Sequence, residues 1–395
     1  MREQEINKLL ENYDGAFYVY DIGKLKQRIS FLRSSMPNKV SLCYAVKANT
    51  FVIKEIEKDL DRFEICSPGE ANICRKLGVD TEKMVISGVY KTPYVIENMI
   101  KDKEFKGIYT VESMHQFEIL CKFSEKYGRN VKVLLRLTND SQFGINEEDI
   151  FEIIKNRERV NNIDILGIQY FSGTQKQSVK KLKRELTHLD EFLKRLEAEL
   201  SYTAKELEYG TGFPVMYFEA DEFNEEEFFK EFSELINSME YRGKITLEIG
   251  RSMVADCGEY YTRIVDMKTN KGQNYLLIDG GMHQLVYYGQ HMAMKQPYFA
   301  VCGKEKDKKD KLWNICGSLC SMNDIIVKQA AMPDIKIGDT LVFKNVGAYC
   351  STEGISLFLS RDLPTVYLLN ENNKIITVRS RIETEVFNTP NYERK

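Results

Sequence analysis

The chain has 395 residues, of which 43% are hydrophobic and 29% are charged, and its formal net charge is −3. This composition is typical of a soluble globular protein, and the length suits two domains or one large barrel with an appended domain. The weak negative charge gives no reason to expect nucleic acid or an anionic membrane surface as a partner, and no run approaches the roughly 18 apolar residues of a transmembrane helix.

The N-terminal segment and the cysteines indicate the compartment. The segment MREQEINKLLENYDG is charged and has no apolar signal-peptide core, so we expect a cytoplasmic protein. Nine cysteines are scattered without the spacing of a disulfide framework, which predicts reduced thiols. Cys316 and Cys320 form a C-x3-C pair that could supply two zinc ligands, but the sequence nearby offers no second pair of zinc ligands. We therefore expect no metal site.

Strand-like runs alternate with segments of helical spacing over the first 250 residues. The runs are FYVYD (Phe17–Asp21), VSLCYAVKA (Val40–Ala48), FEICS, MVISG, GIYTV, VKVLLRL, IDILGIQYF, ELEYG and ITLEIG. Strands that alternate with helices predict parallel βαβ units. About eight such units before residue 251 predict a (β/α)8 barrel. An open doubly wound sheet is the alternative, because periodicity alone does not show closure.

The pattern changes after about residue 255. Short strand-like runs such as QNYLLIDG, DIIVKQAAM, DTLVFKNV and KIITVRS are split by turns, which predicts a β-domain. The run FYVYD stands before the first βα unit, so we expect it to pair with that domain. The predicted division is a barrel over residues 23–254 and a β-domain built from residues 1–22 and 255–395.

Candidate functional residues lie at the ends of the predicted barrel strands, where barrel enzymes keep their sites. Lys47 closes the run VSLCYAVKA, and a partly buried lysine amine can react with a carbonyl group. Gly210, Thr211 and Gly212 follow the run ELEY, and glycines there let backbone amides approach a phosphate. The alternatives are a surface lysine and a simple turn.

The run ITLEIG delivers two charged side chains to the same edge. Arg251 would clamp a phosphate, aided by the amide of Gly250. Glu248 would hydrogen-bond a pyridine nitrogen and keep it protonated, and a structural salt bridge is the alternative. The order of strand-end lysine, glycine loop and Glu-x-Gly-Arg is more specific than any one of its parts.

Over nearly its whole length the chain resembles the fold-type III pyridoxal-phosphate decarboxylases, which include diaminopimelate, ornithine and arginine decarboxylases. The segments YAVKAN (Tyr44–Asn49), FEICSPGE (Phe63–Glu70) and EIGR (Glu248–Arg251) are similar to motifs of this family. So are IDGGM, CSMND and GAY, which begin at Ile278, Cys320 and Gly347. The resemblance implies an alanine-racemase-like (β/α)8 barrel with a C-terminal β-domain, active as a homodimer.

The resemblance also implies a role for each matching residue. Lys47 would carry pyridoxal 5'-phosphate, Glu248 would face its ring nitrogen, Phe171 would stack on the ring, and Arg136 would lie near it. Cys320, delivered by the partner subunit, would protonate Cα, a task that suits a thiol. The residues expected around the phosphate are Thr174, Gly210, Thr211, Gly212, Gly250, Arg251 and Tyr349.

Three rival functions are weighed against decarboxylation. A racemase of this fold places an arginine opposite the ring nitrogen, and Glu248 argues against it. A non-catalytic regulator related to ornithine decarboxylase would lose the lysine or the phosphate ligands, whereas Lys47, Arg251, Cys320 and Tyr349 are kept. Pyridoxal-phosphate carrier proteins are single barrels without a β-domain.

Departures from the family pattern bear on the substrate. Ser321 follows the cysteine where diaminopimelate decarboxylases have an acidic residue, and GGMHQLVYYGQH offers no arginine for a distal carboxylate. A free diamino acid would leave its distal cation without a partner. The segments FSGTQ, GGMHQ and SLCS resemble instead a branch that acts on glutamyl groups tethered to an acyl-carrier protein or on siderophore and antibiotic precursors. His283, Gln284, Ser321 and Asp324 then become candidate substrate contacts, and ordinary loop residues are the alternative.

We therefore expect decarboxylation of a modified or carrier-tethered amino acid. The alternatives are a free amino acid, namely ornithine, lysine, arginine or diaminopimelate, and racemisation.

Overall fold

The computed structural model describes residues 2–391, which form two units. The barrel unit comprises residues 28–214 and 224–253, and the β-domain unit comprises residues up to 27, 215–223 and from 254 onward. Residues 1 and 392–395, at the ends of the predicted β-domain, lie outside the described residues. No helix of residues 2–391 is both long enough and apolar enough to cross a membrane.

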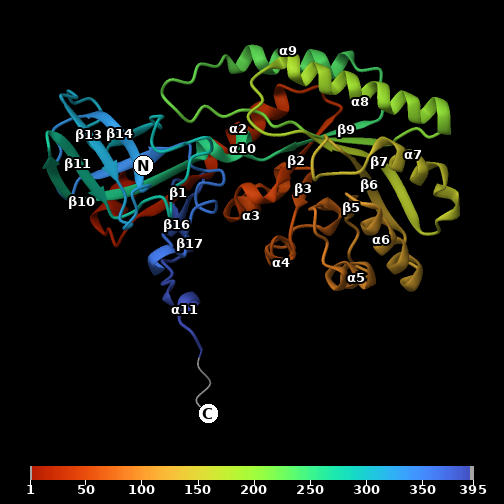
Figure 1. Ribbon diagram of the computed structural model, residues 1–395, viewed down its shortest axis with the longest axis horizontal. Coiled ribbons are helices and arrows are strands. Elements are labelled where there is room, and N and C mark those ends of the chain that lie inside the picture. The colour runs from red at the N-terminus through yellow and green to blue at the C-terminus, as the bar shows by residue number, and fades with distance from the viewer. Residues whose placement is uncertain (1, 392–395) are drawn as a thin grey trace. The chain divides into compact units, whose positions relative to one another are not determined.

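Eight parallel strands within the described chain close into a barrel (Figure 1). Closure is made by β9 pairing with β2, which confirms the barrel and removes the open sheet. Strands β3, β5 and β8 are buried at every position, as expected for strands covered on both faces. The barrel strands are β2 (Val40–Ala45), β3 (Arg62–Ile65), β4 (Met84–Ile86), β5 (Ile108–Val111), β6 (Val131–Leu137), β7 (Ile163–Phe171), β8 (Glu206–Gly210) and β9 (Lys244–Ile249).

Helices follow the barrel strands along the chain. The longest, α8 (Val179–Leu200), buries apolar residues three or four positions apart on one face, which is the spacing of an amphipathic helix. Side chains of Ser67 and Ser113 cap the helices that follow them by accepting backbone N–H groups. The other helices of this part of the chain are α2 (Ile22–Ser34), α3 (Ile53–Ile56), α4 (Pro68–Lys76), α5 (Pro93–Lys101), α6 (Met114–Tyr127), α7 (Glu147–Lys155), α9 (Glu225–Ser238) and α10 (Arg251–Val254).

The segment after β2 differs from the prediction. The predicted strand runs to Ala48, but β2 ends at Ala45 and Lys47 lies in a 3-10 turn, η1 (Val46–Ala48). The cause is the register, because Ala45 is the last residue of β2 that pairs with β3. The chain then leaves the ladder and turns, so Lys47 is placed by a turn rather than by a strand.

The β-domain contains a nine-stranded sheet in the described residues, and its main path runs β14-β13-β11-β10-β1-β16-β17. Strand β1 pairs antiparallel with β10 and parallel with β16, the partnership that its place before the first βα unit predicts. The strands are β1 (Phe17–Asp21), β10 (Gly258–Asn270), β11 (Gln273–Ile278), β12 (Phe299–Val301), β13 (Lys311–Cys316), β14 (Ile325–Met332), β15 (Thr340–Lys344), β16 (Thr365–Leu369) and β17 (Ile375–Arg379).

The first helix of the chain covers part of this sheet. Ile6 of α1 (Arg2–Glu11) packs with Phe17, Tyr261, Val342 and Leu369 in one buried apolar cluster. The rings of Phe17 and Tyr261 are stacked with centroids 4.9 Å apart. The described chain ends after a one-turn helix, α11 (Glu385–Asn388).

Candidate active site

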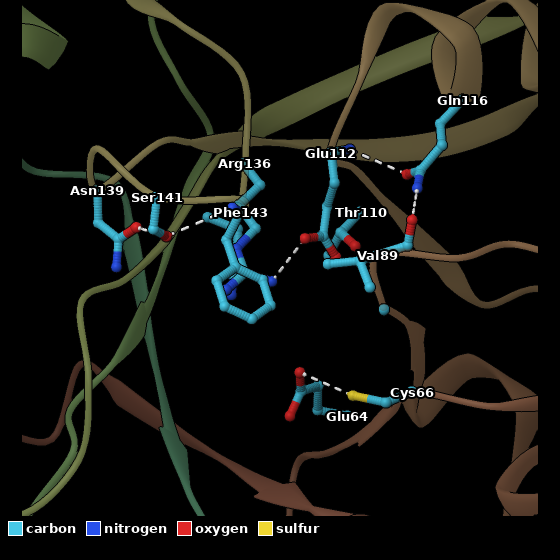
Figure 2. Close-up of polar contacts among 12 residues, drawn as sticks. Glu64, Cys66, Val89, Thr110, Glu112, Gln116, Arg136, Asn139, Ser141 and Phe143 are labelled. Carbon is cyan, nitrogen blue, oxygen red and sulfur yellow. Dashed lines mark hydrogen bonds and ion pairs between the residues drawn. The ribbon is translucent and has the colours of Figure 1, made fainter.

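Lys47 meets two side chains from the neighbouring strand β3 and its end. Its Nζ lies 2.8 Å from Oε2 of Glu64 and 3.4 Å from Sγ of Cys66, and the Cys66 thiol donates to the other Glu64 oxygen at 3.3 Å. Figure 2 shows the Glu64 carboxylate facing the Cys66 sulfur. Burial by itself raises the pKa of Glu64, but the Lys47 ammonium outweighs burial and holds that pKa below its ordinary value. Glu64 therefore stays a carboxylate beside the lysine.

Two further carboxyl groups are buried between strands β7, β8 and β9. Nε2 of Gln169 donates to Oε1 of Glu248 at 2.9 Å, and Glu208 lies one strand away in register with Gln169. Burial, together with the neighbouring carboxylates of Glu64 and Glu208, raises the pKa of Glu248 well above its ordinary value. Burial also raises the pKa of Glu208. We therefore expect Glu248 to hold a proton when no cation lies beside it.

Arg136, near the end of β6, forms a buried ion pair. Its Nη1 lies 2.8 Å from Oε2 of Glu112, and its guanidinium lies 4.8 Å from the ring centroid of Phe143 (Figure 2). The Gln116 side chain accepts from the Glu112 amide and donates to the Val89 carbonyl. These contacts fix the direction of the Arg136 side chain at the barrel mouth.

A second lysine, Lys91, is buried nearby. Its ammonium donates to the Gly88 carbonyl at 3.0 Å, to Gln116 at 3.1 Å and to Thr110 at 3.3 Å. Burial lowers the pKa of Lys91 to about 8. Such a lysine is partly neutral near physiological pH. Lys91 is therefore a second amine at the barrel mouth, besides Lys47, that could react with a carbonyl group.

The glycine loop after β8 is shaped for close approach by a ligand or by backbone. Gly212 has a φ of +60°, and a Cβ there would lie 2.0 Å from the Gly173 carbonyl oxygen. A Cβ on Gly210 would lie 2.5 Å from the ring of Phe171, which ends β7. Thr211 is tied to β9, because its amide and hydroxyl both donate to the Glu248 carbonyl at 3.3 Å. Neither glycine can carry a side chain here.

The loops after β7 and β9 meet at the same edge of the barrel. Nε of Arg251 donates to the Thr174 hydroxyl at 3.4 Å, and Arg251 is 7% exposed. Gly250 lies between β9 and α10, and its carbonyl accepts the Met253 amide. The structure thus brings Thr174, Gly210, Thr211, Gly212, Gly250 and Arg251 together around one edge of the barrel mouth.

A buried ion pair supports this edge from below. Nζ of Lys176 lies 2.7 Å from Oε2 of Glu185 on α8 and 3.5 Å from the Gly210 carbonyl. Ser172 and Tyr209 donate to the same Glu185 carboxylate at 2.5 and 2.6 Å. The cluster joins the end of β7, the end of β8 and α8, so it holds the two loops in place.

The β-domain carries the remaining predicted site residues. Cys320 is exposed in the loop between β13 and β14, and Ser321 follows it. Asp324 is buried, and its two oxygens accept the amides of Met282 and Leu319 at 2.7 and 2.8 Å. Asp324 therefore joins the Cys320 loop to the Met282 segment.

His283, Gln284 and Tyr349 also belong to the β-domain. The Gln284 amide donates to the Asp362 carbonyl and accepts from the Tyr260 hydroxyl, so it is held by the domain itself. His283 is 2% exposed, and its Nδ1 has no hydrogen-bond partner among residues 2–391. Tyr349 has a φ of +64°, an uncommon backbone conformation for a residue with a side chain.

The residues at the barrel mouth fit pyridoxal phosphate. A half-exposed lysine, a loop that only glycine can form and the buried Arg251 supply an amine and a phosphate cradle. In the described part of the chain, several buried atoms at the mouth also lack a hydrogen-bond partner. These atoms are Oε1 of Glu112, Nε of Arg136, Oε1 of Gln169 and Oε1 of Glu208. Native proteins rarely leave such atoms unpaired, which indicates a bound polar group or water.

The fold and these side chains define a (β/α)8 barrel enzyme that binds a phosphorylated carbonyl cofactor. Residues 22–255 match the family model described as pyridoxal-dependent decarboxylase, pyridoxal binding domain. This match spans more than half of the chain, so the chain belongs to the pyridoxal-dependent decarboxylases, which confirms the resemblance seen in its sequence. It is a pyridoxal-phosphate-dependent amino-acid decarboxylase.

Relatives of the chain differ in their substrates. An L-glutamyl-[BtrI acyl-carrier protein] decarboxylase of Niallia circulans is 22% identical over 412 residues, covering 96% of this chain and 94% of that protein. A 2-[(L-alanin-3-ylcarbamoyl)methyl]-2-hydroxybutanedioate decarboxylase of Staphylococcus aureus is 25% identical over 388 residues, covering 90% and 94%. The structure of diaminopimelate decarboxylase from Helicobacter pylori complexed with L-lysine has a TM-score of 0.84, 23% identity and coverage of 96% and 98%.

Sequence reasoning missed several side chains at the barrel mouth. Glu64 and Cys66 lie within the motif FEICSPGE, and their positions one strand from Lys47 would have pointed to them. Gln169 and Glu208 face each other across β7 and β8. Lys91, Glu112 and Lys176 lie in loops that follow strands, where neither periodicity nor a motif singles them out.

Proposed function

We propose that the chain decarboxylates an amino acid whose side chain is modified or tethered to an acyl-carrier protein, rather than free diaminopimelate. The observation that carries this proposal is that the Cys320 loop has no charged side chain free to bind a substrate. Residues Cys320–Asn323 contain no charged side chain, and both oxygens of Asp324 are taken by backbone amides. This loop therefore presents no carboxylate to a distal ammonium group.

Two relatives support this substrate class. One is named for a glutamyl group on a carrier protein and the other for an alaninyl amide of a hydroxybutanedioate, so in both names the amino acid is joined to a larger group. The comparison with diaminopimelate decarboxylase supports the fold. A modified substrate would also explain Ser321, which stands where the family resemblance places an acidic residue in diaminopimelate decarboxylases.

The proposed anchoring of the cofactor uses the barrel mouth. Lys47 would hold the cofactor aldehyde, and the Glu64 carboxylate would keep the amine oriented at 2.8 Å. Arg136 would lie near the ring, and Phe171 would pack on its face. The residues proposed to bind the phosphate are Thr174, Gly210, Thr211, Gly212, Gly250, Arg251 and Tyr349.

The proposed chemistry breaks the bond between Cα and the carboxylate. When bound, the cofactor supplies an electron sink for the pair of electrons that CO2 leaves behind. Glu248 would hold a proton at the ring nitrogen, with Gln169 and Glu208 fixing its carboxyl group. Cys320 would give a proton to Cα. Loss of CO2 and gain of one proton yield the amine, which balances the reaction.

Assembly and location are proposed from the family resemblance. The chain would act as a cytoplasmic homodimer, and Cys320 would serve the barrel of the partner subunit. His283, Gln284 and Ser321 would lie on the path of the substrate, with Asp324 holding their loops together.

The test is CO2 release from free and tethered substrates. We expect glutamyl-carrier protein, or an amide-linked diaminopropionate, to be turned over at least a hundredfold faster than any free amino acid, because binding of the attached group orients Cα. The free panel contains glutamate, ornithine, lysine, arginine and meso-diaminopimelate.

Lys47→Ala is the control for cofactor-dependent release, and a chiral assay of recovered substrate checks for racemisation. Rapid release from a free amino acid would overturn the substrate proposal and leave the decarboxylase assignment intact.

A further inference from the structure

The β-domain unit contains a cavity of about 520 Å³, and its lining includes His283 and Gln284, two of the residues proposed above to lie on the path of the substrate. Two loops form most of it, one running from Asp279 to Gln284 and the other from Leu359 to Pro364, with Gly15, Ala16 and Arg381 at its border. All of these residues belong to the same unit. Cavities of this volume hold small organic molecules.

Two side chains in this cavity are left with unused hydrogen-bonding capacity. The exposed Arg361 donates to the Ser318 carbonyl at 3.0 Å, but none of residues 2–391 forms an ion pair with it. His283 is 2% exposed, and its Nδ1 lacks a hydrogen-bond partner within the described chain. A buried imidazole nitrogen without a partner is unfavourable unless a ligand or water completes it.

The other charged side chains of the cavity already have partners. Arg381 lies 3.2 Å from a carboxylate oxygen of Asp362 and 3.3 Å from one of Asp14. Asp279 accepts hydrogen bonds from the hydroxyls of Tyr13 and Thr262 and from a backbone amide. Arg361 is therefore the cation of the cavity that has no ion pair among residues 2–391, and the Asp279 carboxylate is met by neutral donors.

The loop that presents Arg361 has an unusual backbone. Leu359 and Ser360, which precede it, have φ values of +59° and +50° although neither is glycine. Two consecutive residues in this conformation are energetically unfavourable, and such segments are held in place where a side chain must be aimed. The unfavourable backbone next to Arg361 agrees with a binding role for this loop.

We propose that this cavity is a binding site for a small carboxylate, with Arg361 as its cation and His283 as a neutral N–H donor. A planar guanidinium can donate two parallel N–H groups to the two oxygens of a carboxylate. Burial lowers the pKa of His283 to about 4, with Arg361 adding to the effect, so its imidazole is a neutral donor. The proposal stands on the β-domain alone and does not require that the chain decarboxylates anything.

The experiment titrates citrate into the holoenzyme, whose phosphate cradle is already filled by its cofactor. We expect saturable binding of one citrate per chain by calorimetry, with a shift of the His283 ring resonances, which are resolvable because the chain has four histidines. Arg361→Gln should weaken the binding at least tenfold, and the neutral trimethyl ester of citrate should not bind.

The matched control is Lys328→Gln, which removes one positive charge from the exposed side of β14 and should leave citrate affinity unchanged. Arg361 is exposed, so its variant is expected to fold, and circular dichroism checks this. Absence of citrate binding, or equal binding by Arg361→Gln, would overturn the site. CO2 release is measured separately, so a failure of the citrate-site proposal can be distinguished from a failure of the proposed decarboxylase function.

Inhibition kinetics distinguish whether the carboxylate that binds here is part of the decarboxylation substrate or part of a separate ligand. If it belongs to the decarboxylation substrate, citrate will raise KM and leave kcat unchanged. If it belongs to a separate ligand, citrate will change kcat and not KM. Either pattern supports the site if Arg361→Gln abolishes it, and a pattern that persists in Arg361→Gln contradicts it.

Discussion

The neighbouring strand β3 supplies the side chains that surround Lys47. Ala45 pairs with Glu64, so the turn that follows β2 places the lysine amine against the carboxylate and thiol at the end of β3. Burial, followed by the negative charge of Glu64, raises the pKa of the Cys66 thiol well above its ordinary value. Cys66 is therefore a neutral hydrogen-bond donor to Glu64 rather than a nucleophile.

Cys320 is the contrasting cysteine, because it is exposed on a loop without charged neighbours between residues 320 and 323. If it protonates Cα in the partner subunit, the two inactive variants Lys47→Ala and Cys320→Ala should complement one another. A mixed dimer would contain one barrel with both groups intact. We expect about a quarter of wild-type activity after random subunit exchange, from the statistics of mixing, measured as CO2 release.

The control for this experiment is a mixture of Lys47→Ala with the double variant Lys47→Ala/Cys320→Ala, in which no barrel has its lysine. That mixture should stay inactive. Recovery no greater than this control, in dimers shown by mass spectrometry to be mixed, would refute the delivery of Cys320 across an interface.

Among the elements, the segment between β7 and α8 is the one whose energetics bear on the site. Lys176 is 3% exposed and its cation rests on the Glu185 carboxylate beneath the glycine loop. Removing one partner of a buried pair leaves the other charge uncompensated, at a cost of about 3–5 kcal/mol. We expect Glu185→Gln to lower the free energy of unfolding by that amount at pH 7, measured by urea unfolding with circular dichroism.

The same variant has a predictable pH dependence. Burial tends to raise the pKa of Glu185, but bonds from Lys176, Ser172 and Tyr209 outweigh it and lower that pKa. A lowered pKa stabilises the fold above the unfolded value of about 4.3, and this stability is lost as pH falls through the folded value. The difference between wild type and Glu185→Gln should therefore shrink below about pH 4.

Glu199→Gln on the same helix is the matched control, because its ion pair with Arg195 is exposed. Such pairs contribute less than about 1 kcal/mol. A Glu185→Gln variant as stable as this control, or one with the same deficit at low and neutral pH, would show that the buried pair does not support the loop.

Element boundaries show where sequence patterns stop being informative. The run FVIKEIEKDLDRF has helical spacing, but it forms only the single turn of α3 between two 3-10 turns, η2 (Thr50–Val52) and η3 (Glu57–Asp59). The Asn49 side chain accepts the Phe51 amide and starts this tight path. The chain must reach β3 at Arg62 within a few residues, and that tertiary requirement outweighs helical spacing.

For the whole molecule, alternation of strands and helices was sufficient to predict the barrel. The motifs singled out loop residues such as Thr174 and Arg251, which the fold brings to one edge of the barrel mouth, and their roles stay predictions. The buried partners were not predictable, because pairs such as Arg136 with Glu112 or Arg62 with Glu206 depend on which strands become neighbours. The cavity of Arg361 and His283 was missed for the same reason. Its two loops lie about 80 positions apart in the sequence and meet only in the folded β-domain.

The central claim is that the cofactor is anchored at Lys47, so that the barrel mouth is the active site. Lys91 is the informative competitor, because it is buried at the same mouth and its pKa is lowered to about 8. The most direct measurement is borohydride reduction of the holoenzyme followed by peptide mapping with mass spectrometry. The predicted result is one cofactor per chain on Lys47 and none on Lys47→Ala. Cofactor found on Lys91, or on Lys47→Ala at wild-type level, would contradict it.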